Sequence, residues 1–144
     1  MRKIYAIVGL ISVICILLSV AIQIEKNGYE HNSPVSGLCS ITPGSQCETV
    51  QTSVYGSTFG VSNPYYGIIG FSLILIASVI LLFKKSKLCQ WIIEAGSVIS
   101  GAVALRFLYI QAFVLGQYCI LCVIVDSFSL VLLGMTIYLI IKYR

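Results

Sequence analysis

The sequence has few charged residues. Nine of its 144 residues are Lys or Arg and five are Asp or Glu, so 10% are charged, while 58% are hydrophobic. A soluble domain has roughly 25% charged residues and about half apolar ones, which excludes that class here. The same composition excludes a disordered or collagen-like chain. A chain of this length and composition indicates a membrane protein with room for about four helices of ~20 residues.

Four apolar segments are long enough to cross the ~30 Å hydrocarbon core of a bilayer. They span about residues 4–24, 64–83, 91–115 and 118–141. None alternates strictly between apolar and polar residues, which disfavours a β-barrel. The first apolar run exceeds the ~7–15 residues of a signal-peptide core, so we expect it to be retained. The sequence predicts an all-α membrane protein, a single domain over residues 1–144 built as a bundle of four transmembrane helices.

Basic residues are distributed unequally between the two sides of this bundle. Only Lys26 falls on one side, and seven fall on the other: Arg2, Lys3, Lys84, Lys85, Lys87, Lys142 and Arg144. The positive-inside rule places these seven, and therefore both termini, in the cytoplasm. A prokaryotic cell membrane is the favoured setting, with the endoplasmic-reticulum membrane as the alternative. The net charge of +4 then reflects orientation, and we expect no nucleic-acid partner.

Residues 25–62 form one long loop on the non-cytoplasmic side. A loop of this length in a small protein is usually functional or disordered. Within residues 48–57, Val50 and Val54 are spaced i, i+4. This spacing predicts a short amphipathic helix that lies over the bundle.

Four of the six cysteines fall on that same side: Cys39 and Cys47 in the long loop, and Cys119 and Cys122 in a C-x-x-C motif at the outer start of the last helix. This side is oxidising in bacteria, archaea and the endoplasmic reticulum. Two dithiol pairs placed there can pass electrons by thiol–disulfide exchange. Because a helix N-terminus favours thiolate, Cys119 suits exchange with the loop, and the deeper Cys122 suits a reactant dissolved in the membrane.

Other interpretations of these cysteines remain open. The four could form structural disulfides, and a four-cysteine zinc site is disfavoured by the long gap between the pairs and by the membrane depth of one pair. The remaining two, Cys15 and Cys89, are expected to be small apolar residues. A non-enzymatic four-helix protein with structural disulfides and a small transporter are the alternative functions.

A longer pattern joins these cysteines to residues between them. It runs Cys39-x7-Cys47-x5-Ser53, then Gly56, Phe59 and Gly60, then Asn63-x3-Gly67, and ends at Cys119-x-x-Cys122. This pattern, with the number and order of the helices, resembles the vitamin K epoxide reductase family of quinone-reducing membrane thiol oxidoreductases. The resemblance covers nearly the whole chain.

The resemblance implies roles for the cysteines. Cys119 and Cys122 would be the active-site pair, with Cys122 attacking the quinone. Cys39 and Cys47 would be shuttle cysteines, with Cys47 exchanging with Cys119. Electrons would come from a thioredoxin-fold partner, which we expect to be a separate protein because the chain ends at Arg144. The substrate would be menaquinone, ubiquinone or a vitamin K-type quinone, and no metal is expected.

The resemblance also implies roles for residues outside the cysteine pairs. Ser53 would support the loop beside the active site, Asn63 would donate a hydrogen bond to a quinone oxygen, and the segment around Phe59 would cap the quinone pocket. Vertebrate-type members have a quinone-binding tyrosine four residues after the second active-site cysteine. This chain has Asp126 there, so we expect a different polar contact to the quinone.

Charged side chains inside a bilayer need a partner. Arg106 and Asp126 lie at similar predicted depth on neighbouring antiparallel helices, about 12–14 Å in by helix rise. We hypothesise that they form an ion pair, with Arg106 supporting the site. Asp126 also follows Cys122 by four residues and therefore shares its face. It could exchange a proton with the quinone or the thiol, so structural and catalytic roles both remain open.

Overall fold

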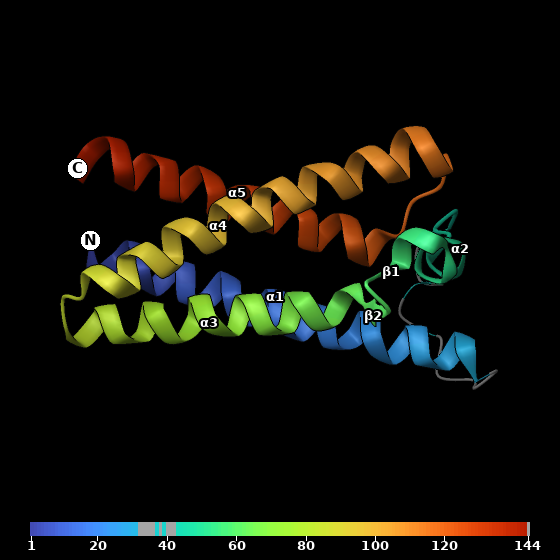
Figure 1. Cartoon of the computed structure of the whole chain (residues 1–144), viewed down its shortest axis with the longest axis horizontal. Helices are drawn as coiled ribbons and strands as arrows, with labels where there is room; N and C mark the ends of the chain where they lie inside the picture. The colour runs from blue at the N-terminus through green and yellow to red at the C-terminus, as the bar shows by residue number, and fades with distance from the viewer. Residues whose placement is uncertain (32–36, 38, 40–42, 144) are drawn as a thin grey trace.

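The structure is a computed structural model that describes residues 1–31, 37, 39 and 43–143. Its four long helices run side by side along the molecule, with both termini at the same end (Figure 1). These helices are α1 (Arg2–Glu30), α3 (Asn63–Phe83), α4 (Lys87–Tyr109) and α5 (Ile120–Tyr143). All four are long and apolar enough to cross a membrane, counting with α4 its continuation to Leu115. The predicted helical membrane bundle is therefore confirmed.

The helix ends differ from the predicted bounds where polar residues continue a helix. α1 extends beyond the apolar run to Glu30, because its C-terminal end packs against α2 and buries Glu25 and Lys26. α4 begins at Lys87, where the Ser86 hydroxyl accepts the Cys89 N–H at 3.5 Å and caps the helix. α5 begins at Ile120, so Cys119 immediately precedes it.

Small residues allow the helices to approach closely. α1 packs against α3 and α5, and α4 packs against the same two helices. A Cβ added at Gly67 of α3 would lie 2.9 Å from the Ser19 Oγ of α1. One added at Gly101 of α4 would lie 2.7 Å from the Leu133 side chain of α5. Such contacts suit helices in lipid, where van der Waals packing replaces the hydrophobic effect.

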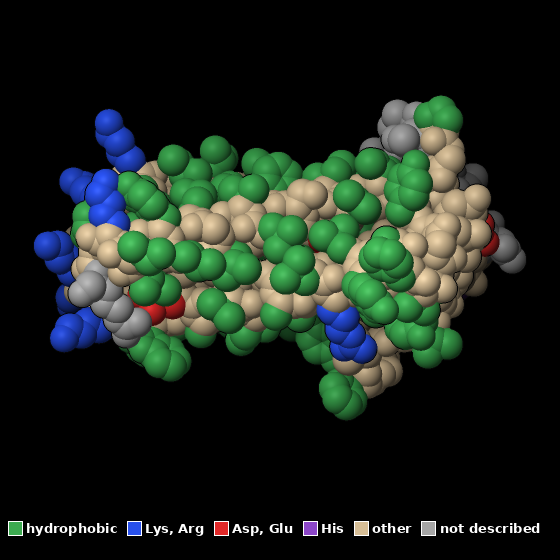
Figure 2. Space-filling view, turned by 90° about the horizontal axis from the view of Figure 1, so that it is seen from above, with side chains coloured by type: hydrophobic (Ala, Val, Ile, Leu, Met, Phe, Trp, Pro, Cys, Tyr) green, Lys and Arg blue, Asp and Glu red, His purple; other side chains and the backbone are tan. Residues whose placement is uncertain are grey.

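The sides of the bundle are apolar, and one end of it is basic. Hydrophobic side chains cover the length of the bundle in Figure 2, while most Lys and Arg gather at the end that carries both termini and the α3–α4 turn. Large apolar residues such as Leu17 and Ile69 are more than half exposed along the helices. This pattern fits lipid contact around the bundle.

The loop between α1 and α3 contains short elements at the opposite end of the bundle (Figure 1). They are α2 (Cys47–Thr52), a 3-10 turn η2 (Val54–Gly56), and strands β1 (Ser57–Thr58) and β2 (Val61–Ser62), which pair antiparallel. The single helix expected over 48–57 is divided, because Ser53 is extended and separates α2 from η2. As a result Val50 packs against the core, whereas Val54 is 89% exposed.

Candidate active site

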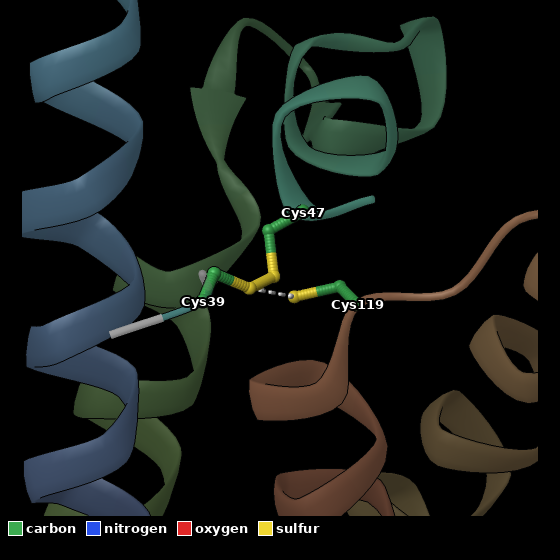
Figure 3. A group of neighbouring side chains, drawn as sticks. All are labelled: Cys39, Cys47 and Cys119. Carbon is green, nitrogen blue, oxygen red and sulfur yellow. Dashed lines mark hydrogen bonds between the residues drawn. A yellow bond between two sulfur atoms is a disulfide. The ribbon is translucent and has the colours of Figure 1, made fainter. Parts of the chain in front are cut away.

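Three sulfur atoms from separate parts of the chain meet at the end of the bundle opposite both termini. Cys39 and Cys47 form a disulfide, and Cys39 Sγ lies 4.0 Å from Cys119 Sγ (Figure 3). All three sulfurs lie within 4.8 Å of one another. The three side chains are nearly inaccessible to solvent, and Ile22 and Leu121 complete their small apolar core. A free thiol facing a disulfide at this separation is suited to thiol–disulfide exchange.

Ser45 joins the loop disulfide to the start of α5. Its hydroxyl accepts the Ile120 N–H at 3.2 Å and lies 3.4 Å from both disulfide sulfurs. The neighbouring Gln46 N–H donates to the Tyr118 carbonyl at 2.9 Å. The loop is therefore held against the residues that precede the C-x-x-C motif.

A second set of contacts places Cys119 itself. Beyond Tyr109, α4 widens into a π-helical turn, η3 (Ile110–Leu115), and ends at Gly116, whose φ of 62° is left-handed. Gln111 in this turn is buried, and its Oε1 accepts the Cys119 N–H at 2.9 Å. Irregular turns of this kind are frequent at functional sites. Here the turn ties the end of α4 to the start of α5.

The hydrogen bonds around Cys119 favour its thiolate. The hydrogen bond from the Cys122 thiol lowers the pKa of Cys119 most. Burial acts in the opposite direction, because it penalises the charged thiolate. The backbone N–H groups of Cys122 and Leu121 and the side chain of Gln51 add further donors. Together they lower the pKa of Cys119 from its ordinary value of 9.0 to about 7. Cys119 is therefore the activated sulfur beside the disulfide.

The extension of α1 supports the loop from the other side. Glu25 is 1% exposed, and its Oε1 accepts the Cys39 N–H at 3.0 Å. Its Oε2 lies 3.4 Å from the Tyr29 hydroxyl, one helical turn further along α1. This carboxylate therefore orients the backbone of Cys39.

The structure does not form the ion pair expected between Arg106 and Asp126. Asp126 is buried, and its Oδ2 has no hydrogen-bond partner among the described residues, whereas Arg106 is exposed. The reason is helical phase. Ala104 of α4 faces the bundle, and Arg106, two residues later, lies about 200° further around the helix. Asp126 remains one turn beyond Cys122 on α5, without the partner that the sequence suggested.

The three remaining predicted residues lie in the segment that leads into α3, which begins at Asn63. Ser53 donates to the Val50 carbonyl at 2.7 Å. Asn63 accepts the Thr58 hydroxyl at 2.8 Å and donates to the Tyr55 carbonyl at 2.6 Å. Phe59 occupies the β1–β2 turn with a left-handed φ of 53° and is 97% exposed. Ser53 and Asn63 thus hold the segment, and the Phe59 side chain is exposed at its turn.

Four contact residues were not predicted from the sequence. They are Glu25, Ser45, Gln51 and Gln111. Gln51 follows Cys47 by four residues, and this i, i+4 spacing is the one signal that could have indicated it. Cys39, Cys47 and Cys119 also have the chemistry to bind a soft metal ion, but the disulfide leaves only one of these three sulfurs free.

A free dithiol beside a disulfide, in a bundle of membrane helices, defines the class of membrane thiol–disulfide oxidoreductases. Comparison with known families gives the same result. Residues 6–137 match the sequence model of the vitamin K epoxide reductase family. The match spans nearly the whole chain, and the protein belongs to this family.

Proposed function

We propose that this protein oxidises dithiols at the outer face of a membrane and reduces a quinone. The observation that carries the proposal is the disulfide of Cys39 and Cys47 with Cys119 Sγ 4.0 Å away, at the end of a helix that enters the membrane. The family supports it, because its members are oxidoreductases that use a quinone substrate.

The proposed electron path has two exchange steps. A thioredoxin-fold partner reduces the Cys39–Cys47 disulfide and becomes oxidised. Cys47 then attacks the Cys119–Cys122 disulfide at Cys119, and Cys39 resolves the mixed disulfide. Two electrons thereby reach the C-x-x-C pair, and the loop disulfide forms again. The structure has the pairing expected after this step, with the loop disulfide formed and Cys119 and Cys122 free.

Quinone reduction completes the cycle. The Cys122 thiolate attacks the ring and forms a carbon–sulfur bond. Cys119 then attacks the Cys122 sulfur, so the carbon–sulfur bond breaks and the Cys119–Cys122 disulfide forms. The quinone gains two electrons and two protons and leaves as quinol. Cys122 suits this role because it lies one turn inside α5 and is only partly buried.

Asp126 is our candidate proton donor to the quinone. A buried carboxyl that lacks an ion-pair partner favours its neutral, protonated form. Asp126 follows Cys122 by one turn, and its Oδ2 has no partner among the described residues. A carboxylic acid in this place could deliver a proton as the ring is reduced. We further propose that Asn63 binds a quinone oxygen, that Phe59 closes over the bound ring, and that Ser53 keeps their segment in position.

We propose that both termini lie in the cytoplasm and that the cysteine cluster lies on the outer side of the membrane. The clustering of basic side chains at the end with both termini supports it (Figure 2). Residues 1–144 would then be one membrane domain that works with a separate thioredoxin-fold donor. The family generally works with such partners.

A quinone assay with purified protein tests the proposal. With a small permeant thiol as reductant, we expect absorbance changes that report quinol formation. Cys122→Ser should abolish them, and Cys15→Ser, which changes a buried cysteine far from the cluster, should leave them unchanged. Cys39→Ser should spare reduction by the small thiol but block a thioredoxin-fold donor. Activity that persists in Cys122→Ser would contradict the mechanism and favour a non-enzymatic four-helix protein or a transporter.

A further inference from the structure

Gln51 is a buried amide that contacts the free thiol of another element. It lies one turn after Cys47 in α2 and is 4% exposed. Its Nε2 donates to Cys119 Sγ at 3.6 Å. The helix that begins at one shuttle cysteine therefore also carries a hydrogen-bond donor to the facing active-site cysteine (Figure 3 shows both cysteines).

Packing alone does not account for an amide in this place. The Oε1 of Gln51 is buried and has no hydrogen-bond partner among the described residues. A buried amide with one end unsatisfied destabilises a fold relative to an apolar side chain of similar size. The Nε2 end has Cys119 as its hydrogen-bond partner, and an N–H donor binds a thiolate more strongly than a thiol. This contact therefore points to a role in sulfur chemistry.

We propose that Gln51 is a positioning residue that stabilises the Cys119 thiolate when α2 is docked on the bundle. The proposal rests on the function proposed above and deepens it. When Cys39 attacks Cys47 in the mixed disulfide, the Cys47–Cys119 bond breaks and its electron pair goes to Cys119. The Gln51 N–H is in place to receive the negative charge as it forms. A better-stabilised leaving thiolate departs faster.

Gly56 lets η2 pack directly against the backbone of α2 at Gln51. A Cβ at Gly56 would overlap the backbone carbonyl of Gln51, so only glycine permits this close approach. The Gly56 carbonyl accepts the Lys26 ammonium of α1 at 3.0 Å. α1 and η2 together hold Gln51 against Cys119. Because Cys47 and Gln51 both belong to α2, the docked helix places one sulfur of the disulfide and the thiolate-stabilising amide beside Cys119 together.

Site-resolved alkylation of Cys119 tests the proposal without a quinone. The protein, with its loop disulfide intact and Cys119 and Cys122 reduced, reacts with iodoacetamide over a series of pH values. Peptide mass spectrometry then quantifies modification of Cys119 separately from Cys122. Since the pKa of Cys119 is about 7, we expect the rate to reach half its maximum near that pH. Gln51→Leu should move this midpoint upward by about 0.5 to 1 pH unit, which lowers the rate about three- to tenfold below the midpoint.

A second variant and a control make the result specific. Gln51→Glu keeps the size of the side chain and adds a carboxylate, so it should move the midpoint at least as far upward. Thr49→Ala changes an exposed residue of α2 and should leave it in place. The other titratable groups near Cys119 are Cys122 and Asp126 on α5 and Glu25 and Tyr29 on α1, and all of them are retained.

Two outcomes would overturn the proposal. One is a midpoint that stays in place in both Gln51 variants, even where the maximal rate changes, because a purely structural residue alters access and not thiolate formation. The other is an equal shift in Thr49→Ala. If the unmodified protein does not reduce a quinone, the proposed function is contradicted. The alkylation result would still show whether Gln51 stabilises the Cys119 thiolate.

Discussion

The side-chain oxygen of Gln111 accepts the backbone N–H of Cys119 at 2.9 Å, and both residues are buried. This hydrogen bond joins the π-helical end of α4 to the residue before α5. It satisfies the backbone N–H of a residue that precedes the first turn of α5. Cys119 is therefore positioned by a residue eight places earlier in the chain.

Gln111→Leu should destabilise the protein and displace Cys119. The substitution leaves a buried N–H without an acceptor, which costs about 1–3 kcal/mol. We expect a lower thermal unfolding midpoint in detergent and slower exchange between Cys119 and the loop disulfide. Gln90→Leu is the control, because the Gln90 amide contacts Tyr5 near the opposite end of the bundle. Equal effects of the two substitutions would contradict a specific role for Gln111.

Asp126→Asn should slow quinone reduction with little change in thiol exchange. If Asp126 donates a proton to the ring, its loss should lower the rate about 10²–10⁴-fold, the usual contribution of a general acid. Asp126→Glu should restore part of the activity. The measurement is quinol formation in single-turnover experiments that start from the reduced protein. An unchanged rate and pH profile in Asp126→Asn would remove Asp126 from the mechanism.

Arg106→Gln tests the missing ion pair directly. Arg106 is exposed, and the buried Asp126 Oδ2 has no partner among the described residues. The substitution should therefore change the unfolding midpoint by little, and the double variant with Asp126→Asn should show additive effects. Strong non-additivity in this double-mutant cycle would indicate that the two side chains interact.

Ser45→Ala should slow exchange between the two cysteine pairs. The hydroxyl accepts the Ile120 N–H and contacts both disulfide sulfurs, so its removal loosens the loop against α5. We expect slower electron transfer from a protein donor, while a small permeant thiol that reaches the C-x-x-C pair directly still drives quinone reduction. Ser57→Ala, at an exposed position of β1, provides the control. Equal losses with both reductants would place Ser45 in quinone reduction instead.

Gly56→Ala should displace α2 from the bundle. Its Cβ would overlap the Gln51 carbonyl, and backbone cannot move aside as a flexible side chain can. Because Cys119 is inaccessible under the docked loop, displacement should raise the maximal alkylation rate of Cys119 severalfold. Gly70→Ala should have no such effect, since a Cβ there meets open space. An unchanged alkylation rate in Gly56→Ala would contradict the fixed position of α2.

The sequence predicted the bundle well because the apolar runs are long and nearly free of charge. It also selected Cys39, Cys47, Cys119 and Cys122, and the first three meet in the structure. The ends of the helices were less predictable. The predicted loop begins at Glu25, yet α1 continues to Glu30, because a helix can continue outside the hydrocarbon wherever its polar residues find partners.

The contacts that tune the sulfurs could not be predicted. Gln51 and Gln111 reach Cys119 from different elements, so their roles depend on tertiary placement that no local pattern encodes. The Arg106–Asp126 pair failed for a related reason. Equal depth in the membrane is necessary for an ion pair, but the rotation of each helix decides which face its side chain takes, and α4 turns Arg106 outward.

Burial of the disulfide has a kinetic consequence for any protein that delivers electrons to it. Cys39 and Cys47 are 4% and 2% exposed, so a partner's thiolate has no line of approach to either sulfur in this conformation. Under the proposed function, each turnover would begin with a local movement of α2 away from Cys119. With a saturating donor, the frequency of that movement would set the upper limit on the rate, and the docked position of α2 would shield the disulfide from unrelated thiols between turnovers.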